Sequence, residues 1–110
     1  MTEGYWRRKV RERDGDRCHM EINLGGGWRQ CGAEAHHTAH IYRRHACGLA
    51  KFEPDVAIRA CYDCHSEFDS RNSTNVRVPA YAEERAYKTI VAFAKNAPPP
   101  PRQDLFGRRL

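Results

Sequence analysis

Residues 56–68 read VAIRACYDCHSEF, and this stretch holds the strongest structural signal in the chain. The apolar run at 56–60 predicts a short strand, and residues 62–68 predict a helix directly after it. Cys61 and Cys64 have the Cys-x-x-Cys spacing with which two thiolates hold one tetrahedral ion at such a turn. The stretch therefore predicts a strand and a helix that share a metal site.

A four-coordinate ion needs two further ligands, and Cys18 and Cys31 are the available thiols. They lie at the two feet of residues 17–31, which we expect to form an irregular hairpin with glycines at its tip. A structural zinc ion held by all four cysteines would replace much of the core that so short a chain lacks. The competing interpretation is a set of buried free thiols.

The fifth cysteine, Cys47, is left over by this assignment. We expect a free thiol there, and the alternative is that Cys47 replaces Cys31 as a zinc ligand. An odd number of cysteines fits metal binding in a reducing compartment better than a disulfide framework. The N-terminus has no apolar signal core, and no apolar run reaches the length of a membrane span. These features predict a cytoplasmic protein with no membrane partner.

The composition indicates one polar domain with a basic balance. The 110 residues are 40% hydrophobic and carry a formal charge of +5, and the sequence pI is about 9.1. A basic chain suits a polyanionic partner such as a nucleic acid, although the same charge also serves solubility. Composition alone therefore leaves both interpretations open.

Outside the opening stretch, the sequence predicts two flanking helices, one strand and two connecting loops. The two helices are expected at residues 3–14 and 81–95, and the strand is expected within residues 33–42. The two loops are expected at residues 43–54 and 70–79. We expect a single domain over residues 1–97, with its core at about 14–70 and its C-terminal helix at about 80–96. Residues 98–110 are predicted to form a proline-rich spacer and a basic tail.

The histidines provide candidates for hydrolytic chemistry. Phosphodiester hydrolysis at neutral pH needs a base that deprotonates water and a positive charge that stabilises the phosphate. A histidine supplies the base because its pKa lies near neutrality, and a divalent ion supplies the charge. Taken one at a time, each histidine is as well explained by packing or by the surface, so the pattern as a whole carries the argument.

This pattern resembles a known nuclease family. The run Glu34-Ala35-His36-His37, the basic pair Arg43-Arg44 and residues 53–65 resemble the HNH endonucleases of the ββα-metal superfamily, closest to the small cysteine-bearing phage and bacterial kind. The resemblance covers about residues 7–69. It implies an α+β fold in which a small ββα-metal core is stapled by the four-cysteine zinc site and flanked by an N-terminal and a C-terminal helix.

The resemblance also implies a role for each histidine. His37 would be the general base that activates the attacking water. His36 and His65 would be ligands of a catalytic ion, which in this family is usually magnesium, manganese or a similar divalent metal. Asp69, four residues after His65, is either a further ligand or a solvated helix end. The cleaved strand would carry 5′-phosphate and 3′-hydroxyl ends.

The chain departs from the family pattern at two places. Val56 stands where the family has its central asparagine, which braces the loop of the general base, and Asp55 is the neighbour that could take over this role. If the bracing matters, asparagine at position 56 should raise activity. The second departure is a short spacing before His36, which allows another register with His40 as the base and Ala39 at the ligand position.

Together these features predict a DNA endonuclease that nicks or cuts both strands, and a nuclease of this kind holds DNA mainly by its phosphates. The candidate DNA-binding residues are Arg43, Arg44, Lys51, Arg11 and Arg17. The alternative is a weakly active or inactive zinc-stabilised module that binds DNA or a partner, for example in phage DNA packaging. An interaction domain without a nucleic-acid role is a third interpretation.

The C-terminal tail is a candidate partner site. Its run Asp104-Leu105-Phe106 resembles the end of short peptides that dock on bacterial sliding clamps. Arg102 stands at the leading position, where those peptides usually have glutamine. A replication or packaging protein is therefore a candidate partner, whereas a disordered or self-packing tail is the favoured interpretation.

Overall fold

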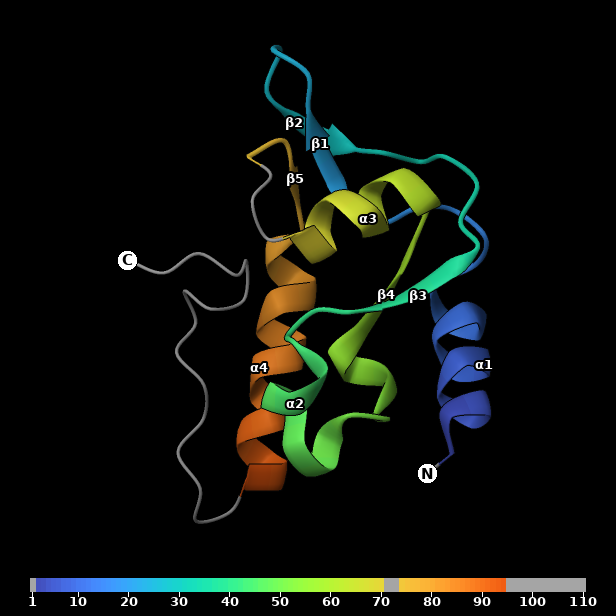
Figure 1. Cartoon of the computed structure of the whole chain (residues 1–110), viewed down its shortest axis with the longest axis vertical. Helices are drawn as coiled ribbons and strands as arrows, with labels where there is room; N and C mark the ends of the chain where they lie inside the picture. Colours follow the sequence, from blue (N-terminus) through green and yellow to red (C-terminus); the bar gives the residue numbers. More distant parts are fainter. Residues whose placement is uncertain (1, 71–73, 95–110) are drawn as a thin grey trace.

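The computed structural model describes residues 2–70 and 74–94 as a mixture of helices and short strands (Figure 1). The helices and 3-10 turns are α1 (Glu3–Asp14), α2 (Arg44–Cys47), η1 (Gly48–Ala50), η2 (Pro54–Val56), α3 (Tyr62–Ser70) and α4 (Ala80–Ala94). The strands are β1 (Glu21–Asn23), β2 (Trp28–Gln30), β3 (His37–His40), β4 (Ala57–Ala60) and β5 (Val76–Arg77). The predicted α+β class is confirmed at this level. The expected spacer and tail at 98–110 lie outside the described residues.

The unit formed by β3, β4 and α3 positions the candidate site. β3 and β4 pair antiparallel, with His37 opposite Ala60 and His40 opposite Ala57. Only Cys61 separates β4 from α3, so the helix turns back across one face of this hairpin (Figure 1). Since side chains alternate along a strand, His37 faces α3 while His40 faces α1. Within the described residues β3 pairs with β4 alone, which leaves its other edge free.

α1 covers the opposite face of the hairpin. Trp6 and Val10 lie four residues apart on the helix, are fully buried and pack with Ala57 of β4. The Trp6 indole Nε1 donates a hydrogen bond to the Glu53 carbonyl at 3.1 Å. The same ring stacks on His40 with the ring centroids 4.5 Å apart. α1 therefore fixes the position of His40.

The main core lies on the other side of the hairpin and is closed by α4. Ala82, Ala86 and Ile90 recur at helical spacing and are the buried residues of this helix. They pack in one cluster with Val56 and Ile58, which come from η2 and β4. α4 thereby holds the two consecutive elements that lead to Cys61.

A second sheet, in the order β2-β1-β5, lies at the end of the molecule that contains α3 (Figure 1). Ile22 of β1 stands opposite Arg29 of β2 and opposite Val76 of β5. The tip between β1 and β2 contains Gly25 and Gly27, whose φ angles of 106° and 99° favour glycine. The predicted hairpin over residues 17–31 is confirmed.

The element predictions fail mainly in the connections. α2 and η1 lie within 43–54, which was expected to be a loop, and the two-residue β5 lies within the expected loop at 70–79. Both are short and are held by packing rather than by a periodic apolar pattern. Among residues 2–70 and 74–94, none of the helices has both the length and the apolar character that a bilayer crossing requires.

Candidate metal centre and histidine pocket

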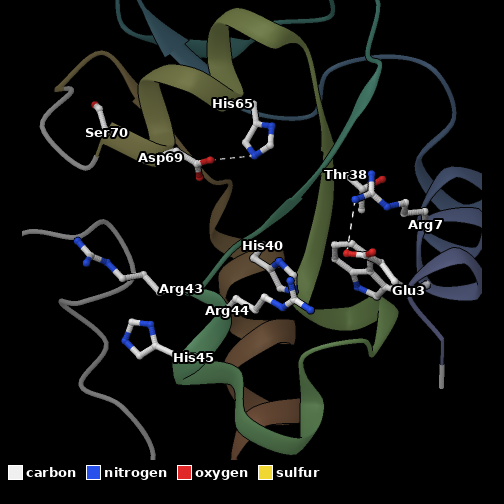
Figure 2. Close-up of a pocket in the computed structure, with 11 residues that line it drawn as sticks. Glu3, Arg7, Thr38, His40, Arg43, Arg44, His45, His65, Asp69 and Ser70 are labelled. Carbon is white, nitrogen blue, oxygen red and sulfur yellow. Dashed lines mark ion pairs between the residues drawn. The ribbon is translucent and has the colours of Figure 1, made fainter.

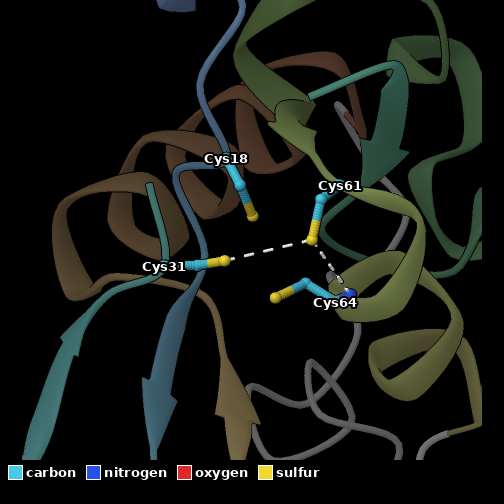
Figure 3. A group of neighbouring side chains, drawn as sticks. All are labelled: Cys18, Cys31, Cys61 and Cys64. Carbon is cyan, nitrogen blue, oxygen red and sulfur yellow. Dashed lines mark hydrogen bonds between the residues drawn. The ribbon is translucent and has the colours of Figure 1, made fainter. Parts of the chain in front are cut away.

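Four cysteine side chains from different parts of the chain converge between the two sheets (Figure 3). Cys18 precedes β1, Cys31 follows β2, Cys61 lies between β4 and α3, and Cys64 lies in the first turn of α3. All four sulfur atoms lie within 4.8 Å of one another, and Cys31 and Cys61 are 3.9 Å apart. A tetrahedral zinc ion with bonds of about 2.3 Å separates its sulfurs by about 3.8 Å. The group could therefore hold a metal ion such as zinc.

The acidity of these thiols supports a cation at this place. A hydrogen bond from the Cys64 thiol lowers the pKa of Cys18 to about 5, although burial opposes this shift. The pKa of Cys64 is raised, first by its bond to Cys18 and then by burial. One thiolate is thus stabilised at the expense of its neighbours. A bound cation removes this conflict because it stabilises several thiolates together.

Cys47 lies apart from the cysteine cluster, and the prediction of a separate thiol there agrees with the structure. It is buried at the end of α2, where its Sγ lies 3.5 Å from the Arg43 carbonyl and 3.9 Å from the Tyr42 carbonyl. Cys31 keeps its place in the cluster.

A cavity of about 580 Å³, here called the histidine pocket, lies along the free edge of β3 (Figure 2). Polar residues from α1, from β3, from the start of α2 and from α3 line it. They include Thr38, His40, Arg43, Arg44, His65 and Asp69. Figure 2 shows His65 and Asp69 on α3 across from His40 and Arg44. With Glu3, Arg7 and His45 included, three histidines, two carboxylates and three guanidinium groups line this cavity.

His65 is the centre of a chain of three polar side chains. Its Nε2 lies 3.1 Å from the Asp69 Oδ2, and its Nδ1 lies 2.9 Å from the Nδ1 of His37. One of the two Nδ1 atoms must carry the proton of this hydrogen bond. When His65 is the donor, its Nε2 carries no proton and presents a lone pair beside the Asp69 carboxylate. The pair can then offer one nitrogen and one oxygen to the same cation.

His40 is held in one orientation and kept neutral. Its Nε2 donates a hydrogen bond to the Lys51 carbonyl at 2.6 Å, which leaves Nδ1 as the basic atom. Burial lowers the pKa of His40, the Lys51 bond opposes this shift, and the charge of Arg44 lowers the pKa further. A neutral imidazole of fixed tautomer can accept a proton at Nδ1.

Arg43 and Arg44 are the charged groups best placed for a phosphate. Both line the histidine pocket and are exposed, and neither forms an ion pair among the described residues. The Arg44 guanidinium lies over the Phe52 ring, 5.0 Å from its centroid. Unpaired guanidinium groups bind phosphate oxygens by charge-assisted hydrogen bonds.

Three predicted active-site residues, namely the expected general base His37 together with His36 and Asp55, are not among the residues that line this pocket. The His36 side chain lines a different cavity, where its Nε2 lies 3.6 Å from Glu34, so it does not converge with His65. Asp55 faces α4: its carboxylate accepts a hydrogen bond from Thr89 at 3.2 Å. His37 is the first residue of β3 and contacts His65 on α3, whereas His36 precedes the strand.

Asparagine at position 56 is expected to destabilise the protein and leave activity no higher. Val56 is fully buried in the main core, so an amide there loses its water without gaining a partner, at about 1–3 kcal/mol. This prediction differs from the sequence-based expectation that asparagine would restore a brace. Urea unfolding and cleavage assays on Val56→Asn check both statements, with Val56→Ala as the control for lost packing; a variant that is both stable and more active would contradict them.

The other predicted DNA-binding residues lie elsewhere. Arg11 forms a two-pronged ion pair with Asp16, at 2.9 and 3.4 Å. The Arg17 guanidinium lies 3.4 Å from the Gly32 carbonyl, near the cysteine cluster. Lys51 offers its carbonyl to His40 while its ammonium lies over the Phe52 ring. Of the five, Arg43 and Arg44 line the histidine pocket.

Sequence reasoning missed the organising role of Arg59. This side chain is 7% exposed and donates to the carbonyls of Ala35 and Gly15 at 2.7 and 3.2 Å. It also lies 3.5 Å from the Thr38 hydroxyl and so ties the end of α1 to β3. A charged residue inside an otherwise apolar strand is the signal that could have indicated it.

No family model, curated protein or solved structure matches this chain in the three comparisons made. Within residues 2–70 and 74–94, the cysteine cluster is the only group of three or more side chains that could hold a metal ion. His65 and Asp69 form a group of two.

Proposed function

We propose that this protein is a metal-dependent DNA endonuclease whose active site is the histidine pocket. The observation that carries the proposal is the convergence of His40, the His65–Asp69 pair and two unpaired arginines on one cavity. The order of β3, β4 and α3, a strand pair followed at once by a helix, supports it further. The HNH family remains the family that the sequence resembles.

His65 and Asp69 would hold the catalytic ion. The 3.1 Å between the His65 Nε2 and the Asp69 Oδ2 suits two ligands of one ion, since bonds of about 2.1 Å at a right angle place ligand atoms about 3.0 Å apart. One nitrogen and one carboxylate oxygen suit manganese better than magnesium, which prefers oxygen throughout. The ion would supply positive charge to the phosphate and to the departing oxygen. His37 would orient His65 through the 2.9 Å bond.

His40 would be the general base in this arrangement, which is the second register of the sequence pattern. Its Nδ1 accepts the proton of the attacking water, and its Nε2–H remains bonded to the Lys51 carbonyl. That bond orients the imidazole. The Lys51 carbonyl would therefore take the bracing role that the central asparagine has in the HNH family. Arg43 and Arg44 hold the phosphate on the side of α2.

The cysteine cluster would be a structural zinc site. The zinc ion has no free position for a substrate when four thiolates hold it. Its role is to fix the start of α3 through Cys64, one residue before His65. The metal centre and the pocket are thereby mechanically connected.

The proposal is tested with supercoiled plasmid in the presence of Mg²⁺ or Mn²⁺. We expect the protein to nick or linearise the plasmid, faster with Mn²⁺, and we expect Asp69→Asn to be at least about 100-fold slower because it loses one ion ligand. Asp63→Asn is the matched control, since Asp63 is an exposed carboxylate on the same helix. If the wild-type protein leaves the plasmid intact with both metals, the inactive DNA-binding or partner-binding module becomes the better interpretation.

A further inference from the structure

A second cavity, here called the α1 pocket, adjoins the histidine pocket. It has a volume of about 430 Å³ and lies between α1 and the segment that leads into β3. Arg7 and Thr38 line both cavities, so the two share a wall. Figure 2 shows Arg7 reaching from α1 toward Thr38. A ligand longer than one cavity can therefore continue from one pocket into the other.

The α1 pocket is rich in guanidinium groups. Three come from one face of α1 and one from β4, and they are Arg7, Arg8, Arg11 and Arg59. Two carboxylates, those of Asp16 and Glu34, line the same cavity. When His36 is left out of the count, four positive and two negative groups line the cavity, which gives a net charge of +2. The charge suits an anion.

Two of these arginines are available to a ligand. Arg7 pairs with Glu3 at 3.5 Å and Arg8 with Glu12 at 4.0 Å, and more than half of each arginine side chain is exposed. Exposed pairs of this length contribute little, so a phosphate can replace the carboxylate. Arg59, by contrast, is buried and uses its donors within the protein. The buried Arg59 guanidinium adds a fixed positive charge beside the exposed Arg7 and Arg8 side chains.

We propose that the α1 pocket binds backbone phosphates of the same nucleic-acid strand whose scissile phosphate occupies the histidine pocket. This inference rests on the proposed function, and it names the substrate as a polynucleotide held over both pockets rather than a small phosphodiester. Arg7, on the shared wall, contacts the strand between the two pockets. Arg8 contacts it further along α1.

The test compares two charge reversals on neighbouring residues of α1. Arg8 lines the α1 pocket, whereas Lys9 lines neither cavity, and both side chains pair with Glu12. Arg8→Glu and Lys9→Glu therefore change the net charge equally and disturb the same helix partner. Binding of a fluorescein-labelled single-stranded oligonucleotide is measured by anisotropy against NaCl concentration, with no added divalent ion and no chelator.

We expect Arg8→Glu to weaken binding at least about tenfold and to lower the salt slope by about one, while Lys9→Glu stays within about twofold. Hydrolysis of bis(p-nitrophenyl) phosphate with Mn²⁺ should be the same in both variants. Equal oligonucleotide binding by the two variants would overturn the proposal for the α1 pocket, even if the plasmid is cut. A wild-type protein that does not bind the oligonucleotide would overturn it as well. A binding difference without plasmid cleavage keeps the subsite and rejects the nuclease.

Discussion

Replacing Cys61 with serine is expected to abolish binding of the zinc ion proposed for the cysteine cluster and to unfold the protein. The Cys61 thiol lies at the junction of β4 and α3, accepts a hydrogen bond from the Cys64 amide at 3.4 Å and lies 3.9 Å from Cys31. A structural zinc site contributes about 10–16 kcal/mol in small zinc-dependent folds, which is comparable to or larger than the total stability of about 5–15 kcal/mol of a typical domain. Metal analysis should fall from one zinc per chain to none, and circular dichroism should lose its helical signal.

Cys47→Ser is the matched control for this experiment. Cys47 is also a buried thiol, but it lies outside the cluster and contacts the Tyr42 and Arg43 carbonyls, to which a serine hydroxyl can donate. We expect this variant to keep its zinc and its fold. A Cys61→Ser protein that remains folded with no metal would show that packing alone supports the cysteine cluster.

Replacing His40 with glutamine is expected to reduce plasmid cleavage by about 10²–10⁴-fold, the usual contribution of a general base. Glutamine can still donate to the Lys51 carbonyl, and it cannot accept a proton from water. Oligonucleotide binding should change little, because the phosphate contacts come from arginines. His36→Gln should retain at least about a third of the activity, since His36 lies in the other cavity. If His36→Gln abolishes cleavage and His40→Gln does not, the first register of the sequence pattern is the correct one.

The pH dependence of kcat/KM gives a second measure of the His40 assignment. A base is active when it is deprotonated, and burial lowers the pKa of His40 below its usual 6.5. Activity should therefore rise with pH through a pKa below 6.5 and be constant at neutral pH. Replacing Arg44 with glutamine removes a charge that lowers this pKa, so the rise should move to higher pH. An unchanged profile in His40→Gln would assign the titration to another group.

The sequence predicted the metal centre better than the pocket, and the reason is physical. A Cys-x-x-Cys turn is a local geometry that the spacing alone defines. The partners Cys18 and Cys31 followed because a four-coordinate ion needs them. The strand and helix around Cys61 followed from short apolar periodicity.

The pocket depends on which face of β3 each histidine occupies. A shift of one residue exchanges the two faces of a strand, so a His-His pair does not reveal which member points toward α3. The structure turns His37 to His65 and His40 to the pocket, and it leaves Val56 in the core. These outcomes follow from the pairing of β3 with β4 and from the packing of Trp6 on His40, which are long-range contacts.

The four cysteines have a consequence for how the chain matures during synthesis. Cys18 and Cys31 leave the ribosome well before Cys61 and Cys64, and β3 has no strand partner until β4 is made. Closing so long a loop is entropically costly, and binding of the proposed ion would offset this cost. Folding is therefore expected to be late and nearly all at once. If the cysteine cluster holds zinc as proposed, a chain made without the ion would not close this loop, and the histidine pocket would not assemble.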